Sequence, residues 1–99
     1  MDKIRVTFYP AAEIELYDAA LYYESQRRGL GSTFLQAIET AMDEIREQPM
    51  ASPRAQGVVR NKRVRRFPYS VMYSAEKGDL RILAIANQKR RPLYWLRRQ

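Results

Sequence analysis

The first hydrophobic pattern along the chain has a period of two residues. Its apolar members are Ile4, Val6 and Phe8, with polar residues between them. Such alternation predicts a short, half-buried β-strand, because successive side chains of a strand point to opposite faces. Pro10 ends the pattern, since proline has no N–H to donate, but its fixed φ suits the first turn of a helix.

Two helical patterns follow. Apolar residues recur at helical spacing at Ile14, Tyr17 and Leu21, and again at Phe34, Ile38, Ala41 and Ile45. Each set predicts an amphipathic helix with one apolar face. The stretch Gly29-Leu30-Gly31 connects the two patterns, and Pro49 ends the second. So short a connection predicts an antiparallel helical hairpin.

The helices are also rich in acids and tyrosines. The acids are Glu13, Glu15, Asp18, Glu24, Glu39, Asp43, Glu44 and Glu47, which we interpret as a solvated helix face. Tyr17, Tyr22 and Tyr23 have near-helical spacing, so we interpret them as packing residues rather than as a platform for stacking bases. Neither group singles out a paired-carboxylate catalytic site.

Three strand patterns complete the chain after a loop over residues 49–57. They are VVRNKRVRR (58–66), YSVMYS (69–74) and LRILAIA (80–86). Phe67-Pro68 and residues 76–79 are typical of turns, so the three strands predict an antiparallel meander. Pro92 suits the start of one or two final helical turns. The predicted fold is a single α+β domain over residues 1–99, in the order β-α-α-β-β-β, with a helical hairpin packed on an antiparallel sheet.

The composition of the chain limits the catalytic and metal-binding chemistry that its side chains can perform. The chain has no cysteine and no histidine, which excludes disulfides, thiolate metal sites and the usual general base. We therefore expect no metal and no cofactor. The N-terminus has no apolar signal-peptide region, and no apolar run approaches the roughly 20 residues of a membrane span. These features favour a cytoplasmic protein without a membrane partner.

The net charge of +7 is distributed unevenly. Residues 1–59 contain six Lys/Arg and nine Asp/Glu, a balance of −3, whereas residues 60–99 contain twelve Lys/Arg and two Asp/Glu, a balance of +10. Because like charges repel one another, such a segment indicates an acidic or polyanionic partner.

Four stretches together resemble one known family. They are YPAAEIEL, YYESQRRGLG, the helix ending at EQP, and the pair RRFPYSVMY and RRPLYWLRR. In these features the chain resembles the RelE/ParE superfamily of type II toxin–antitoxin toxins, and most of all its ParE-like, plasmid-stabilisation branch. The resemblance implies a toxin bound by a small acidic antitoxin encoded next to it. ParE-like members inhibit DNA gyrase by binding, whereas RelE-like members cut mRNA in the ribosome.

A RelE-like endonuclease would need cations and a proton donor and acceptor without histidine. The candidates are Lys62, Arg63, Arg65, Arg81 and Tyr94. If the strand continues through residue 66, Arg63 and Arg65 share one face and Lys62 points to the other. Two positions depart from the RelE-like pattern. Ser70 stands where an arginine is usual, and Gln88 stands near another expected cation, which favours binding over catalysis.

A binding toxin requires a basic surface with aromatic anchors. The predicted target-binding residues are Arg65, Arg66, Arg90, Arg91, Tyr94, Trp95, Arg97 and Arg98. Trp95 could equally belong to the core. The predicted antitoxin-binding residues are Tyr17, Leu21, Phe34 and Ile38, in an apolar groove near the hairpin. The interpretation is a gyrase-binding toxin rather than an enzyme, with an mRNA endonuclease and a generic nucleic-acid-binding module as alternatives.

Overall fold

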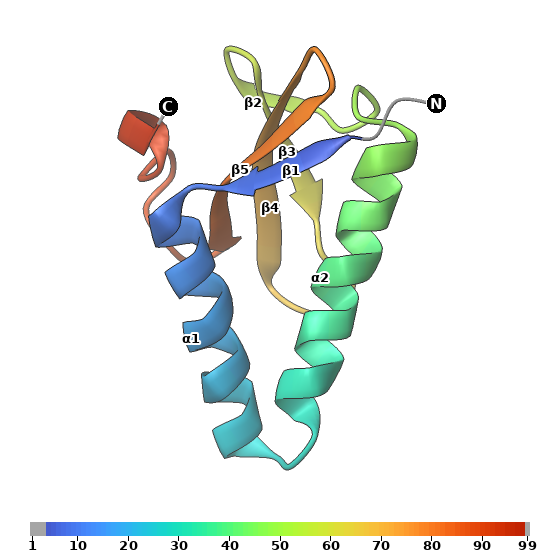
Figure 1. Cartoon of the computed structure of the whole chain (residues 1–99). Coiled ribbons are helices and arrows are strands. Elements are labelled where there is room, and N and C mark those ends of the chain that lie inside the picture. Colours follow the sequence, from blue (N-terminus) through green and yellow to red (C-terminus); the bar gives the residue numbers. More distant parts are fainter. Residues whose placement is uncertain (1–3, 99) are drawn as a thin grey trace.

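The computed structural model describes residues 4–98, and its elements follow the predicted order (Figure 1). They are β1 (Arg5–Phe8), α1 (Pro10–Gln26), α2 (Leu30–Glu47), β2 (Arg54–Gln56), β3 (Val59–Arg63), β4 (Tyr69–Glu76), β5 (Asp79–Asn87) and a 3-10 turn, η1 (Leu96–Arg98). The α+β class is confirmed, and β2 is an added short strand inside the predicted loop. Within residues 4–98, no helix is long and apolar enough to cross a membrane.

The strands form one sheet in the order β1-β5-β4-β3-β2. β3, β4 and β5 pair antiparallel as the predicted meander. The added strand β2 pairs antiparallel with β3, whereas β1 runs parallel to β5 at the sheet edge. A bulge sets Met72 opposite Ala84 and Tyr73 opposite Ile82, so Leu83 is the extra residue of β5. Most of β5 is buried, as its nearly continuous apolar run predicts.

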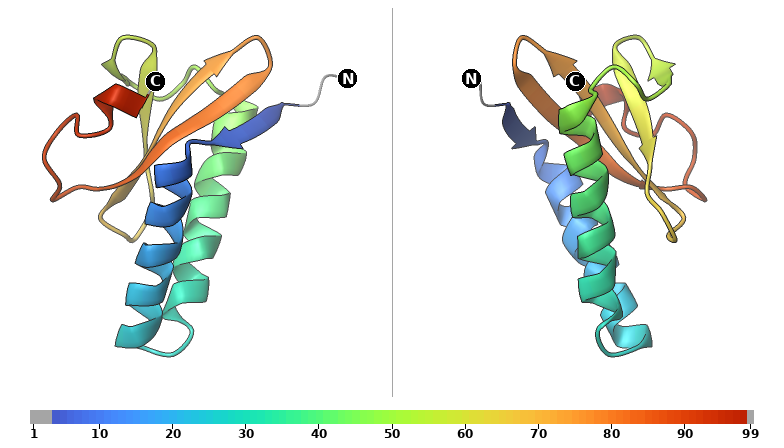
Figure 2. Two further views of the ribbon diagram at one scale, coloured as in Figure 1. Left: turned by 60° about the vertical axis from the view of Figure 1, so that its left-hand side comes forward. Right: turned by 90° about the vertical axis from the view of Figure 1, so that its right-hand side faces the viewer.

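The α1–α2 connection requires glycine at two positions. Gly29 has a φ of 85°, in the left-handed region, and a Cβ on Gly31 would lie 2.5 Å from the Ala20 carbonyl oxygen. The Glu24 carboxylate accepts hydrogen bonds of 3.0 Å from the N–H groups of both glycines, which gives the start of α2 hydrogen-bond partners. The result is the predicted antiparallel hairpin, packed on one face of the sheet (Figure 2).

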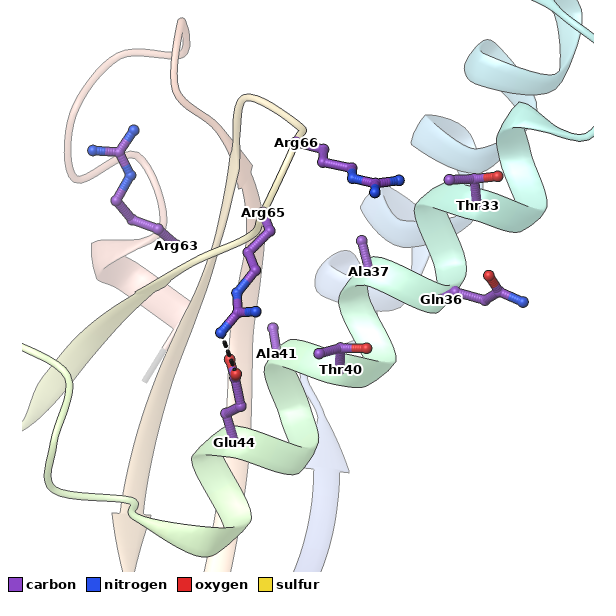
Figure 3. A pocket seen from close by; sticks show the side chains of 9 residues that line it. All are labelled: Thr33, Gln36, Ala37, Thr40, Ala41, Glu44, Arg63, Arg65 and Arg66. Carbon is purple, nitrogen blue, oxygen red and sulfur yellow. Dashed lines mark hydrogen bonds and ion pairs between the residues drawn. The ribbon is translucent and has the colours of Figure 1, made fainter.

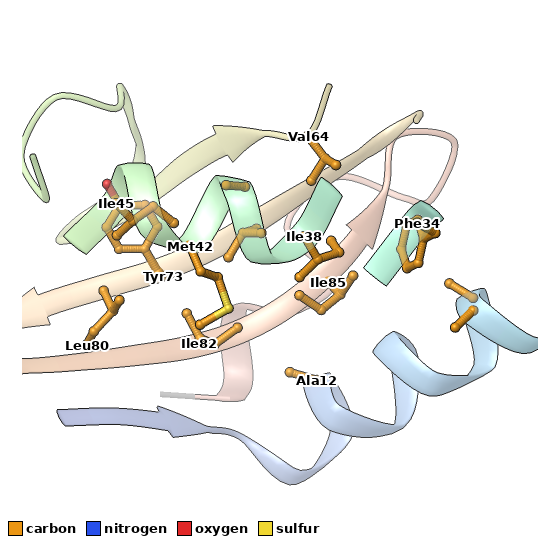
Figure 4. Close-up of a cluster of buried hydrophobic side chains, with 14 residues drawn as sticks. Ala12, Phe34, Ile38, Met42, Ile45, Val64, Tyr73, Leu80, Ile82 and Ile85 are labelled. Atoms are coloured by element: carbon orange, nitrogen blue, oxygen red, sulfur yellow. The ribbon is translucent and has the colours of Figure 1, made fainter. Parts of the chain in front are cut away.

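The main core lies between this hairpin and the sheet (Figure 4). The predicted apolar stripe of α2 is confirmed, because Phe34, Ile38, Ala41 and Ile45 are all buried. Phe34 and Ile38 are only 0% and 3% exposed, so the prediction that an antitoxin contacts these two side chains is wrong for this fold.

Helix α1 packs through different residues from those predicted. Its buried residues are Ala12, Ala19 and Ala20, whereas Ile14, Tyr17 and Leu21 are 61%, 55% and 69% exposed. Small alanines bring the helix backbone close to its neighbours, and the larger side chains then point outward. Tyr22 is also exposed, at 58%. Of the three helix tyrosines, only Tyr23 packs in the core, with its ring against Phe34, Phe67 and Tyr69.

The last segment of the chain covers the opposite face of the sheet (Figure 2). Trp95 is 3% exposed and belongs to a second buried cluster with Val59, Met72, Leu83, Ala84 and Ala86. The sheet is therefore the middle of three layers, between the hairpin and the tail (residues 88–98). Trp95 is a core residue, and its buried ring offers no surface to a target.

Candidate functional site

The residues predicted to face a target fall into two separate groups. Arg90, Arg91, Tyr94, Trp95, Arg97 and Arg98 lie in the tail. Arg65 and Arg66 lie in the turn between β3 and β4, next to α2. One glutamate contacts each group, and the two glutamates come from different helices.

Glu15 of α1 joins three parts of the chain. Its Oε1 accepts hydrogen bonds from the Ile85 N–H at 3.1 Å and from Nη1 of Arg98 at 3.0 Å. Its Oε2 accepts 2.9 Å hydrogen bonds from the Tyr94 hydroxyl and from Nη2 of Arg98, and Nη1 of Arg90 lies 3.5 Å from it. We call these five residues the Glu15 node. The Glu15 side chain is only 14% exposed, which a carboxylate tolerates when it is paired and hydrogen-bonded.

The edge of β5 explains why a carboxylate is needed there. The pairing of β1 with β5 ends at Phe8 and Ile82, because the chain then enters α1. The Ile85 N–H lies beyond that point and has no partner from β1. A buried N–H without a partner costs free energy, and Glu15, in the second turn of α1, accepts its hydrogen bond.

The Glu15 node changes the chemistry of the tail. Burial, followed by the negative charge of Glu15, raises the pKa of the Tyr94 hydroxyl well above its usual value. Burial alone would lower the pKa of Arg98, but the hydrogen bonds and charge of Glu15 outweigh it and raise that pKa. Tyr94 is therefore a hydrogen-bond donor at neutral pH and is poorly suited to act as a general base.

The tail arginines divide into those that contact Glu15 and Tyr94, which are Arg90 and Arg98, and those that do not, which are Arg91 and Arg97. The Arg90 guanidinium lies 3.7 Å from the centroid of the Tyr94 ring, and that of Arg98 lies 5.0 Å from it, both within cation–π range. Arg91 and Arg97 are exposed, and within residues 4–98 neither forms an ion pair. A partner can therefore reach Arg90, Arg91 and Arg97, and of these Arg91 and Arg97 have no ionic partner among residues 4–98.

Glu44 of α2 contacts the second group. Its carboxylate lies 2.9 Å from Nζ of Lys62. It also lies 2.6 Å from Nη2 of Arg65 (Figure 3). The hydrogen bond from Lys62 is the main reason that the pKa of Glu44 falls below its usual value, with the charges of Lys62 and Arg65 adding to it. The prediction that Arg65 shares a face with Arg63 is wrong, because β3 ends at Arg63. Arg65 turns back towards α2, whereas Arg63 points away (Figure 3).

Both glutamates were missed by the interpretation of the helix acids as a solvated face. A local signal existed for Glu15, because it lies three residues after Ala12 and four before Ala19. That spacing is helical, so a stripe of small residues would have placed Glu15 at the core boundary. Glu44 lies three residues after Ala41 in the same way.

The residues proposed for endonuclease chemistry do not come together. Lys62 and Arg65 contact Glu44, Arg81 lies over the Tyr9 ring at 5.8 Å, and Tyr94 contacts Glu15. Arg63 pairs in register with Ser70, which is 5% exposed. No single pocket of the described residues contains this set.

A cavity of about 270 Å³ lies between the tail and the sheet. Its polar lining includes Asn61, Ser70, Gln88, Arg90 and Arg91, and the buried Oδ1 of Asn61 has no hydrogen-bond partner. Ser70 and Gln88, the two departures from the RelE-like pattern, thus lie in one place. Within residues 4–98, no group of three or more acids gathers closely enough to hold a metal ion.

Comparison with known proteins identifies this arrangement. The family model of the ParE toxin of type II toxin–antitoxin systems (parDE) matches residues 6–92. The chain belongs to the ParE toxin family. A search of the solved structures finds a chromosomal ParDE toxin–antitoxin system from P. aeruginosa, with a TM-score of 0.62 and 16% sequence identity over 85% of this chain and 95% of the other. No curated protein sequence gives a match.

Membership of the ParE family confirms the predicted superfamily and the ParE-like branch. This ParE-family toxin therefore acts in a type II toxin–antitoxin system, with an antitoxin as its partner. The likeness to the P. aeruginosa structure shows the fold that they share.

Proposed function

We propose that this ParE-family toxin binds and inhibits DNA gyrase without cutting nucleic acid. The observation that carries the proposal is the tail. Glu15 holds Arg90, Tyr94 and Arg98 on the three-layer core, and Arg91 and Arg97 are exposed beside them. The candidates for RNA cleavage, in contrast, do not converge on one place. Binding requires an ordered, charged surface, and cleavage requires convergent groups.

The proposed gyrase-binding surface is the exposed part of the predicted set. Arg91 and Arg97 supply its charge, and Arg90 stacked on Tyr94 supplies a flat cation–aromatic contact. Arg98 and Trp95 support this surface from beneath. Arg65 and Arg66 extend the basic character to the β3–β4 turn.

The proposed antitoxin-binding surface includes the outward face of α1. Tyr17 and Leu21, both predicted antitoxin contacts, are exposed there together with Ile14. Apolar side chains at this spacing form a stripe that an amphipathic helix can cover. The acidic residues expected of the antitoxin would reduce the repulsion among the basic residues of the toxin.

Two parallel assays on the purified toxin test the proposal. We expect inhibition of gyrase supercoiling, and no new cleavage sites when primer extension is performed on translated mRNA. The double variant Arg91→Ala/Arg97→Ala should raise the half-inhibitory concentration about tenfold, because exposed arginines are frequent hot spots.

The matched control is Arg27→Ala/Arg28→Ala, which removes the same charge from an exposed position at the hairpin connection. It should leave supercoiling inhibition unchanged. Ribosome-dependent cleavage of mRNA with no effect on gyrase would overturn the proposal in favour of an endonuclease.

A further inference from the structure

A second groove, which no tail residue lines, lies between α2 and the β3–β4 turn (Figure 3). Its volume is about 210 Å³, and its lining residues are Thr33, Gln36, Ala37, Thr40, Ala41, Glu44, Arg63, Arg65 and Arg66. The α2 residues recur at intervals of three and four, so they form one face of the helix. Small alanines form the floor of this groove, and hydroxyl and amide side chains line its rim.

The charges of this α2 groove are not balanced. Glu44 is already paired with both Lys62 and Arg65, so its carboxylate is neutralised within the protein. Arg66 is exposed and, within residues 4–98, forms no ion pair. Its side chain extends from the turn towards Thr33 at the start of α2 (Figure 3). Of the three arginines that line the groove, Arg63 and Arg66 form no ion pair within residues 4–98. Arg63 points away from α2, so Arg66 supplies the unpaired guanidinium at the open side of the groove (Figure 3).

The backbone of Arg66 is unusual as well. Its φ is 74°, in the left-handed region that glycine and asparagine occupy far more readily than arginine. Glycine would fit the turn better, so the arginine is not explained by the local fold. A residue in such a conformation is a reason to look for a role of its side chain.

We propose that the α2 groove binds an acidic segment of the antitoxin, with one of its carboxylates paired to Arg66. A guanidinium forms two parallel hydrogen bonds with a carboxylate. The alanine floor accepts a short apolar side chain of the same segment, and Thr40 and Gln36 can hydrogen-bond to its backbone. Charge complementarity selects an acidic ligand, because the only acid of the groove is already neutralised.

The occupant is assigned to the antitoxin for two reasons. It is the partner that membership of the ParE family gives, and the net charge of +7 favours an acidic partner. The inference rests on that partner and not on gyrase. It also places the antitoxin over Arg66, one of the residues proposed to face the target, so neutralisation includes direct competition for this arginine.

The substitution Arg66→Gly separates binding from folding. It removes the guanidinium and installs the residue that suits a φ of 74°, so the thermal midpoint should stay the same or rise. Binding of the purified antitoxin, measured by calorimetry, should weaken about tenfold, in line with the loss of a charge-assisted hydrogen-bonded pair. The loss should be smaller in high salt, which screens exposed charges.

Lys77→Gly is the matched control. Lys77 is also a cation with a positive φ, 49°, but it lies in the β4–β5 turn, outside the α2 groove. It should leave antitoxin affinity unchanged. An equal loss in both variants would show a general effect of charge and overturn the proposal.

A second pair of variants tests the groove independently of Arg66. Thr40→Glu places a carboxylate in the groove and should weaken antitoxin binding, whereas Ser32→Glu adds the same charge to an exposed α2 position outside it. Unchanged affinity in both Arg66→Gly and Thr40→Glu would overturn the proposal. So would a loss of gyrase inhibition in Arg66→Gly with full antitoxin affinity, because the groove would then belong to the target. Absence of any effect of the wild-type toxin on gyrase would refute only the proposed function.

Discussion

Glu15 and Glu44 perform the same task in two different environments. Each lies on a helix and pairs with basic side chains from a distant part of the chain. The Glu15 side chain is 14% exposed and that of Glu44 is 30% exposed. Glu15 also accepts hydrogen bonds from a phenol and from a backbone N–H, and so connects α1, β5 and the tail.

The number of ion pairs that a carboxylate forms is therefore a poor guide to how much they contribute to the stability of the fold. A solvated pair gains little, because water screens it and its side chains lose conformational freedom. A buried pair is costly to break, because the groups that remain lose their partner and cannot return to water. The tail therefore depends on Glu15 far more than the β3–β4 turn depends on Glu44.

Glu15→Ala should have the largest effect. It leaves the Tyr94 hydroxyl and the Ile85 N–H without their acceptor, and it leaves Arg98 with the Leu83 carbonyl but without a counter-charge from Glu15. We expect the free energy of unfolding to fall by about 3–5 kcal/mol. Urea denaturation measures the loss, and Glu13→Ala, an exposed acid of the same helix, is the control. A loss below about 1 kcal/mol, the range of a surface pair, would remove the distinction between the two glutamates.

Tyr94→Phe should have the next largest effect. It removes one hydrogen bond to a charged acceptor while keeping the ring under Arg90, so we expect a loss of about 1.5 kcal/mol in the free energy of unfolding. Tyr22→Phe, at an exposed ring, should change the same quantity very little. Equal losses for the two tyrosines would mean that the Tyr94–Glu15 hydrogen bond is not a significant source of stability.

The pH dependence of stability gives a further test of the contact between Tyr94 and Glu15. The pKa of Tyr94 is raised by folding above its ordinary value of 10.0, so above that pH the unfolded chain releases this proton while the folded chain keeps it. The wild-type protein should therefore lose stability as the pH rises from 10. Urea unfolding at pH 9 and pH 11 should show a smaller loss in Tyr94→Phe, and an identical loss would contradict the shift.

Glu44→Gln should have the smallest effect. The pKa of Glu44 is lowered in the fold, so its contribution is present above its unfolded pKa and is lost as the pH falls through the folded one. The thermal midpoint of the variant should be close to that of the wild type at neutral pH, and closer still at pH 3. A shift at neutral pH as large as that of Glu15→Ala would reverse the comparison.

The elements of the fold could be predicted from local pattern, because each has a strong local cause. The stripe of α2 was correct because large apolar side chains mark its buried face. The face of α1 was not, because alanines bury it, and their small size gives no contrast with the larger residues that remain outside. The distance between a helix and the elements it packs against decides which of its faces is buried, and the sequence pattern of one helix does not contain that distance.

The candidate site was predictable only as a list of residue types. Arg98 and Glu15 are separated by 83 positions, so their pairing follows from the completed fold and not from any periodicity. Whether Trp95 belongs to the core or to the target-binding surface depends in the same way on whether the tail crosses the sheet. The turn at Phe67-Pro68 was predictable from its residues, but the direction in which Arg65 turns was set by Glu44 of α2.

The position of Trp95 has a consequence for the synthesis of the toxin. The residue that covers the second face of the sheet follows all five strands in the chain, so a nascent chain leaves that face open until after the whole sheet has been translated. A chain that stops at Pro92 lacks this cover and also Tyr94 and Arg98 of the Glu15 node, and it should be cleaved readily by protease under conditions where the longer chain resists. Translation that stops before Trp95 therefore leaves one face of the sheet uncovered, and a product of that kind should be the more sensitive to protease.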